Sequence, residues 1–134
     1  DVLAAIEASG AAWGIVTNKP EALARRVVAA VGWSSRSAVL VGGDTLAVKK
    51  PDPGTLLHAC AALGVHPGCC VYVGDDERDV VAARAAGIVS VAVAWGYREP
   101  HEALEHWNPD RIALAPRDLL SPGMLAAAGQ PERA

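Results

Sequence analysis

Apolar residues occur along the chain in short runs of two kinds, and the two kinds alternate. Runs rich in valine and isoleucine, bounded by glycine, proline or polar residues, predict buried strands at 11–16, 39–41, 69–73, 89–93 and 111–114. Segments in which apolar residues recur every three or four positions predict helices at 2–9, 20–32, 52–63, 79–86 and 101–107, with a weak helix after 116. Strand and helix therefore alternate throughout.

This alternation favours one architecture. Strands that alternate with helices are typical of α/β domains, in which helices flank a parallel sheet. With 134 residues, of which 51% are hydrophobic, the chain can form at most one domain with a packed core. We expect a doubly wound, Rossmannoid parallel sheet without an internal repeat or a linker.

The second predicted helix has two distinct faces. Leu23, Val27 and Val31 are spaced by four residues and so share one face, which we expect to be buried against the sheet. Arg25 and Arg26 fall on the opposite face, where we expect solvent.

Charge and hydropathy exclude several classes of protein. The chain carries 12 basic and 15 acidic residues, for a net charge of −3, and no basic run exceeds two residues, which argues against a nucleic-acid partner. No apolar run approaches the roughly 18 residues needed to cross a bilayer, and no leader-like segment opens the sequence. The cysteines Cys60, Cys69 and Cys70 are odd in number, which fits a reducing compartment. We expect a cytoplasmic protein without a membrane partner.

Polar clusters stand at three points where strands and helices meet, and they begin at Thr17, Lys50 and Asp75. In an open α/β sheet, ligands bind in the crevice outside the carboxyl ends of the strands. We therefore expect these clusters to contribute to one site.

The third cluster is strongly acidic. Asp75, Asp76, Glu77 and Asp79 lie within one short turn between a strand and a helix. A single acid there would be favoured by the helix dipole alone, but crowded carboxylates repel one another unless a cation lies among them. Mg²⁺ takes one or two carboxylates and leaves its other positions to water and phosphate oxygens. The cluster favours a site for metal and phosphate.

The other two clusters are suited to an anion. Thr17 ends a predicted strand, and its hydroxyl with the backbone N–H groups of Asn18 and Lys19 can hold a phosphate, although Thr17 or Asn18 could equally serve as a helix cap. Lys50, if it is held in place, can neutralise phosphate or the carboxylates as a point charge. The alternative is a solvated loop lysine, which we expect of Lys49.

These three clusters resemble, in order and spacing, the second, third and fourth motifs of the haloacid dehalogenase superfamily of phosphatases. The matching runs are Thr17-Asn18-Lys19-Pro20, Lys50-Pro51-Asp52-Pro53 and Gly74-Asp75-Asp76-Glu77-Arg78-Asp79. Three further segments are similar to the phosphoglycolate phosphatase branch and to its relative, N-acetylmuramic acid 6-phosphate phosphatase. They are residues 41–44, 82–87 and 95–98. The resemblance extends to about Leu120.

The resemblance implies hydrolysis of a small phosphorylated metabolite with Mg²⁺ as cofactor. In that family an aspartate attacks phosphorus, and water hydrolyses the resulting aspartyl-phosphate. Carried over to this chain, Thr17 would hydrogen-bond the phosphoryl group with help from the Asn18 amide. Lys50 would stabilise the nucleophile and the developing charge.

The acids take separate roles by the same resemblance. Asp75 would ligate Mg²⁺, and Asp79 would orient Lys50 or a metal-bound water. Asp44 and Asp76 are expected close to these residues, in a supporting position.

The family's first motif, a DxDGT-like run that supplies the nucleophile and the general acid-base residue, is absent from the sequence. Ahead of Thr17 the only carboxylates are Asp1 and Glu7. We expect residues 1–134 to be a partial core domain with a cut N-terminal end. It would lack the substrate-selecting cap and the central first strand, which the family places between the strands ending at Thr17 and Val73. Such a chain should be inactive alone and marginally stable, because two buried strands lose a shared neighbour.

Two other functions stay open. A phosphotransfer receiver also combines acids, threonine and lysine around Mg²⁺, but receivers place the acid pair first and the lysine last, whereas here Thr17 and Lys50 precede Asp75. A non-catalytic domain that retains the phosphate pocket is the second alternative. An aspartate pair upstream would favour the enzyme over both.

Overall fold

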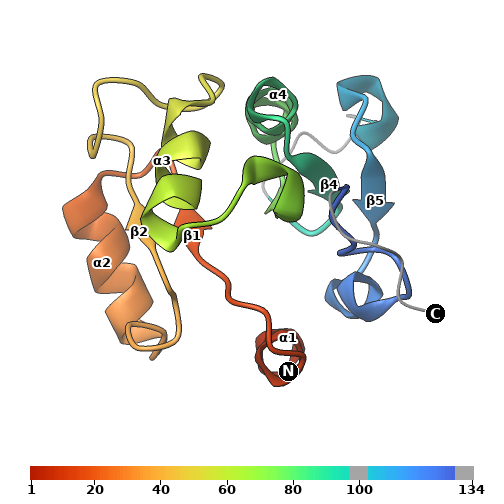
Figure 1. Ribbon diagram of the computed structural model, residues 1–134, viewed down its shortest axis with the longest axis horizontal. Helices are drawn as coiled ribbons and strands as arrows, with labels where there is room; N and C mark the ends of the chain where they lie inside the picture. Colours follow the sequence, from red (N-terminus) through yellow and green to blue (C-terminus); the bar gives the residue numbers. More distant parts are fainter. Residues whose placement is uncertain (97–102, 129–134) are drawn as a thin grey trace.

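The computed structural model describes residues 1–96 and 103–128 of the chain (Figure 1). Its strands form two parallel sheets, one of β1 and β2 and the other in the order β3-β4-β5. Their bounds are Ile15–Val16 for β1, Leu40–Val41 for β2, Val71–Gly74 for β3, Val89–Val93 for β4 and Arg111–Ala113 for β5. The predicted α/β class with parallel strands is therefore confirmed.

Helices connect these strands. Four are α-helices, namely α1 (Val2–Ala8), α2 (Glu21–Ala30), α3 (Gly54–Leu63) and α4 (Glu77–Ala86), and three are short 3-10 helices, namely η1 (Pro67–Cys69), η2 (Leu104–Trp107) and η3 (Pro116–Leu120), within the described residues. In Figure 1 the β1–β2 sheet lies with α2 and α3, and the larger sheet lies with α4. None of the described helices is long and apolar enough to cross a membrane.

Each sheet ends at a strand that is paired on one side only within the described chain. In the smaller sheet β1 pairs with β2, and in the larger sheet β3 pairs with β4. Side chains link the two edges, because the Tyr72 hydroxyl of β3 donates to the Val16 carbonyl of β1 at 2.7 Å. These are the two strands between which the resemblance places a further strand. The marginal stability expected from the lack of such a strand stays a prediction.

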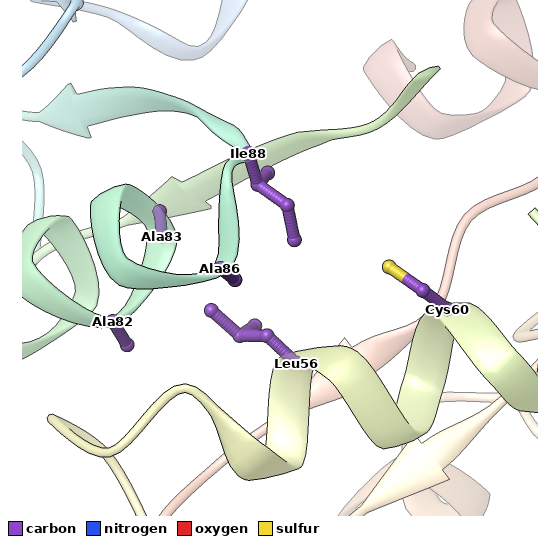
Figure 2. Close-up of a cluster of buried hydrophobic side chains, with 6 residues drawn as sticks. All are labelled: Leu56, Cys60, Ala82, Ala83, Ala86 and Ile88. Atoms are coloured by element: carbon purple, nitrogen blue, oxygen red, sulfur yellow. The ribbon is translucent and has the colours of Figure 1, made fainter. Parts of the chain in front are cut away.

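The main core joins the two halves of the fold. It lies between α3 and α4 and consists of Leu56, Cys60, Ala82, Ala83, Ala86 and Ile88 (Figure 2). Three alanines let the helix backbones approach closely, and Leu56 and Ile88 fill the space between them. Val16 and Tyr72, one from each sheet, pack against this cluster. The helices α3 and α4 therefore hold the sheets together.

The prediction of which face of α2 is buried is wrong. Leu23, Val27 and Val31 are 44%, 46% and 51% exposed, whereas Ala24 and Val28 are buried. The first residue of α2 lies against the Gly42 turn, where an added Cβ would come within 3 Å of the Glu21 backbone. This contact orients the helix, and the inward stripe of Ala24 and Val28 is offset by one residue from the predicted stripe.

Several predicted boundaries also moved. The strand expected at 11–16 is reduced to Ile15–Val16, and the strand expected from 69 begins at 71, because Pro67 and the His66 cap, which accepts from the Gly68 N–H, start a 3-10 turn there. The helix expected at 101–107 is described only in its last part, as η2, and its beginning lies outside the described residues. The three cysteines are free thiols.

Replacement of Leu56 by alanine should lower the free energy of unfolding by about 2 to 5 kcal/mol, because it leaves a cavity between α3 and α4. Leu56 is 2% exposed, whereas its neighbour Leu57 is 41% exposed. Leu57→Ala is thus a matched control that should change stability by about 0.5 kcal/mol or less. Urea denaturation followed by circular dichroism measures both, and equal losses would contradict this placement of the core.

Candidate active site

The candidate site is a pocket of about 320 Å³ at the carboxyl ends of β1 and β3. Thr17 follows β1, Asp75 follows β3, and Lys50, Tyr72 and Asp79 complete the polar lining. The structure therefore brings residues from all three predicted clusters into one place. A larger hollow of about 440 Å³ lies beside α2 and β2, but none of the predicted site residues lines it.

Lys50 is the buried centre of this pocket. It is 9% exposed, and its Nζ lies 2.6 Å from Asp79 Oδ1, 2.7 Å from the Tyr72 hydroxyl and 3.2 Å from the Val16 carbonyl oxygen. An ammonium has three protons and no acceptor, so these partners account for all of its donors. The solvated loop lysine considered as an alternative is excluded for Lys50, whereas Lys49 is exposed, as expected.

Asp79 holds both the lysine and the acidic turn. Its Oδ1 contacts Lys50, while its Oδ2 accepts the backbone N–H groups of Asp75 at 3.1 Å and Asp76 at 3.2 Å. The carboxylate lies directly over Gly74, where any Cβ would overlap it. Each carboxylate oxygen thus has its own donors, which is the arrangement that a buried anion requires.

Asp75, the predicted metal ligand, lies on the wall of the pocket. Its carboxylate packs against Gly96, at which an added Cβ would overlap it. Among the residues that the structure describes, no group of three or more His, Cys, Asp or Glu side chains could hold a metal. One carboxylate is still compatible with Mg²⁺, because that ion commonly keeps water and phosphate oxygens as its other ligands.

Arg78 compensates the charge of Asp76, the neighbouring acid of the turn. Asp76 is the N-cap of α4, accepts from the Arg78 N–H at 2.9 Å and pairs with the Arg78 guanidinium at 3.1 Å. Burial alone would raise the pKa of Asp76, but the hydrogen bonds from Arg78 outweigh it and lower the pKa below the ordinary value. Repulsion among these carboxylates is thus relieved by Lys50 and Arg78, so the acidic cluster alone does not require a metal.

Asp44, the other residue expected in support, belongs to the start of α2. Its Oδ1 accepts the Glu21 N–H at 2.8 Å. Asp44 and Asp76 therefore stabilise helix starts, and neither lines the pocket.

Thr17 and Asn18 have different positions. The Thr17 Oγ1 accepts the Lys19 N–H at 3.1 Å, as in a cap, and the residue also lines the pocket. The Asn18 carboxamide instead bonds to the backbone of Lys50, donating to its carbonyl at 2.9 Å and accepting its N–H at 3.1 Å. The side chain of Asn18 thus fixes the loop that carries Lys50, and it is Thr17 that faces the pocket.

Sequence reasoning missed Tyr72, Trp95 and Gly96, which also line the pocket. Tyr72 stands in an apolar strand two positions before Gly74, and residues spaced by two share one face of a strand. The spacing could therefore have placed Tyr72 on the strand face of Gly74. In the structure Asp79 lies over that face.

A family model described as haloacid dehalogenase-like hydrolase matches residues 1–87. Over 121 residues the chain is 52% identical to a phosphoglycolate phosphatase of Xylella fastidiosa, with 90% of this chain and 53% of that protein covered. It is 43% identical over 120 residues to an N-acetylmuramic acid 6-phosphate phosphatase of Pseudomonas aeruginosa, with the same two coverages of 90% and 53%. The chain spans about half the length of the curated relatives it matches.

A solved structure agrees with these relatives. The crystal structure of a predicted phosphoglycolate phosphatase from Haemophilus somnus superimposes with a TM-score of 0.82 at 30% identity, and the match covers 89% of this chain and 52% of that one. The Rossmannoid fold of the resemblance is therefore confirmed.

Replacement of Asp79 by asparagine should destabilise the fold by about 3 to 5 kcal/mol, because it leaves the buried Lys50 charge without its counterion. The new NH₂ group also cannot accept the two N–H groups that Oδ2 accepts. Glu77→Gln, at an exposed residue of the same helical turn, is the matched control. Urea denaturation measures both variants, and the double variant Lys50→Met with Asp79→Asn should recover part of the loss. If Asp79→Asn behaved like Glu77→Gln, the ion pair would not support the fold.

Proposed function

The chain belongs to the haloacid dehalogenase-like hydrolases, and we propose that it supplies the phosphate-, lysine- and metal-binding part of a phosphatase acting on a small phosphorylated metabolite. The observation that carries the proposal is the buried Lys50 ammonium, which lies in one pocket with the Thr17 hydroxyl and the Asp75 carboxylate. Binding of a phosphate ester and its metal requires a hydrogen-bond donor, a cation and a metal-binding anion.

Each side chain has a proposed role in that pocket. Thr17 donates its hydroxyl proton to a phosphoryl oxygen, and Lys50 offsets the charge that develops there. Asp75 would hold Mg²⁺, which supplies neutralisation of the phosphoryl oxygens when it is bound. Asp79 fixes Lys50, with which it forms the 2.6 Å contact.

We propose that the nucleophile lies outside these 134 residues. We propose an aspartate whose carboxylate oxygen bonds to phosphorus as the ester oxygen leaves, after which water cleaves the aspartyl-phosphate. No Asp-x-Asp pair precedes Thr17 in these residues. The 134 residues alone should therefore not turn over a phosphate ester.

The identity of the relatives suggests a substrate. We propose 2-phosphoglycolate first, since the Xylella phosphoglycolate phosphatase is 52% identical to this chain, and N-acetylmuramic acid 6-phosphate second, since that relative is 43% identical. A receiver role is disfavoured, because the family matched is one of hydrolases.

Complementation tests the proposed activity. The isolated chain should release no phosphate from 2-phosphoglycolate. After fusion to the part of the Xylella relative that it does not match, it should release phosphate in the presence of Mg²⁺. Lys50→Met should abolish this release, because the pocket loses its cation. Lys49→Met, at the adjacent exposed lysine, should leave the release unchanged. Equal activity of the Lys50→Met fusion, or activity of the chain alone, would contradict the assignment.

Metal binding is tested separately by calorimetry. The chain should bind Mg²⁺ weakly, because Asp75 is the one carboxylate proposed to contact it here. Asp75→Asn should remove that binding. The control is Asp76→Asn, whose carboxylate already pairs with Arg78 and whose replacement should leave binding unchanged. Tight binding that survives Asp75→Asn would show that the metal site lies elsewhere.

A further inference from the structure

The loop that follows β4 lies against the residue proposed to hold the metal. Strands β3 and β4 pair in parallel up to Gly74 and Ala92. Asp75 is the first residue after that pair on β3, whereas Gly96 is the fourth residue after it on β4. The chain turns at residues 94–96, and this turn brings Gly96 back over the end of β3 to Asp75. The strand that the resemblance places beside β3 would pair with the other edge of β3, so it would not separate these two residues.

The contact leaves no room for a side chain at position 96. A Cβ added to Gly96 would overlap both the Cβ and the carboxylate of Asp75. Rotation of Asp75 about χ1 moves its carboxylate but not its Cβ, so a new rotamer would not relieve the overlap. An alanine here must therefore displace the loop or the end of β3. The backbone of Gly96 is not left-handed, so the overlap, and not backbone strain, is what an alanine would introduce.

Asp75 is held from two directions. Its backbone N–H donates to Asp79 Oδ2 at 3.1 Å, which fixes the course of the chain where it leaves β3. Its side chain packs against the bare backbone of Gly96, which limits where the carboxylate can lie, and both residues line the pocket. A ligand whose position is fixed before the ion arrives loses less conformational entropy when it binds.

We propose that Gly96 is a positioning residue for the metal: because it lacks a side chain, the loop after β4 can hold the Asp75 carboxylate in the pocket. The inference rests on the proposed function, in which Asp75 binds Mg²⁺. Gly96 supplies no ligand atom in this role, so its replacement weakens metal binding, whereas Asp75→Asn removes the ligand itself. Residues that orient a metal ligand typically change metal affinity by about 10- to 100-fold when they are replaced.

Titration of Mg²⁺ alone into the ¹⁵N-labelled chain tests this role. The backbone amide signal of Asp76, the residue next to the ligand, should shift as the ion binds. Gly96→Ala should raise the Mg²⁺ concentration at half-maximal shift by about tenfold. Gly54→Ala is the matched control, because its Cβ would also meet a side chain, that of Val48 at 2.7 Å, but at a residue outside the pocket lining. The control should leave the titration unchanged.

The outcomes separate this inference from the function on which it rests. Equal titrations of Gly96→Ala and the unaltered chain would overturn the role of Gly96 and leave the metal role of Asp75 standing. Absence of any Mg²⁺ response in the unaltered chain would contradict the metal role of Asp75 and, with it, this inference.

A stability measurement keeps the test decisive if Gly96→Ala fails to fold. The double variant Asp75→Gly with Gly96→Ala lacks the Cβ and the carboxylate that the alanine would overlap. It should therefore regain the cooperative urea transition that the single variant loses. A double variant that stays unfolded would show that the alanine collides with another part of the chain, and would overturn the proposal.

Discussion

A buried ammonium is stable only when every one of its protons meets an acceptor, and Lys50 satisfies that condition by drawing on three elements of the fold. Val16 lies in β1, Tyr72 in β3 and Asp79 in α4. Removal of the charge from water costs several kcal/mol, which the contacts with these partners must offset. The lysine therefore connects the two sheets at the point where chemistry is proposed, and its loop is fixed in turn by Asn18.

The same requirement organises the acids around it. Asp79 uses one oxygen for Lys50 and the other for the backbone of the turn that presents Asp75. Glycines at 74 and 96 leave room for these two carboxylates. A lysine and the proposed metal-binding acid thus lie in one pocket, where Asp79 contacts the lysine and the backbone that presents the acid. This arrangement fits a member of a hydrolase family whose proposed substrate carries phosphate.

The fold that holds this site consists of two small parallel sheets joined through helices. The α3–α4 cluster and the Tyr72–Val16 contact connect them, while β1 and β3 each pair on one side within the described residues. The chain spans about half the length of its curated relatives, and it superimposes on the solved Haemophilus structure over 89% of its residues. The proposed nucleophile would have to enter beside Thr17 and Asp75, the pocket residues at the ends of those two strands.

The sequence by itself determined the order and class of the elements and the place of the three polar clusters, because these follow from local periodicity and from turn and capping residues. It placed β4 at its observed bounds and the ends of α3 and α4 at glycines with left-handed backbone. It could not determine which face of α2 is buried, since the close approach at Gly42 decides that. Nor could it assign Tyr72 and Val16 as further partners of Lys50, or Arg78 as the partner of Asp76. The Tyr72–Val16 bond joins residues 56 positions apart, and only the packing of one sheet against the other brings such atoms within reach of each other.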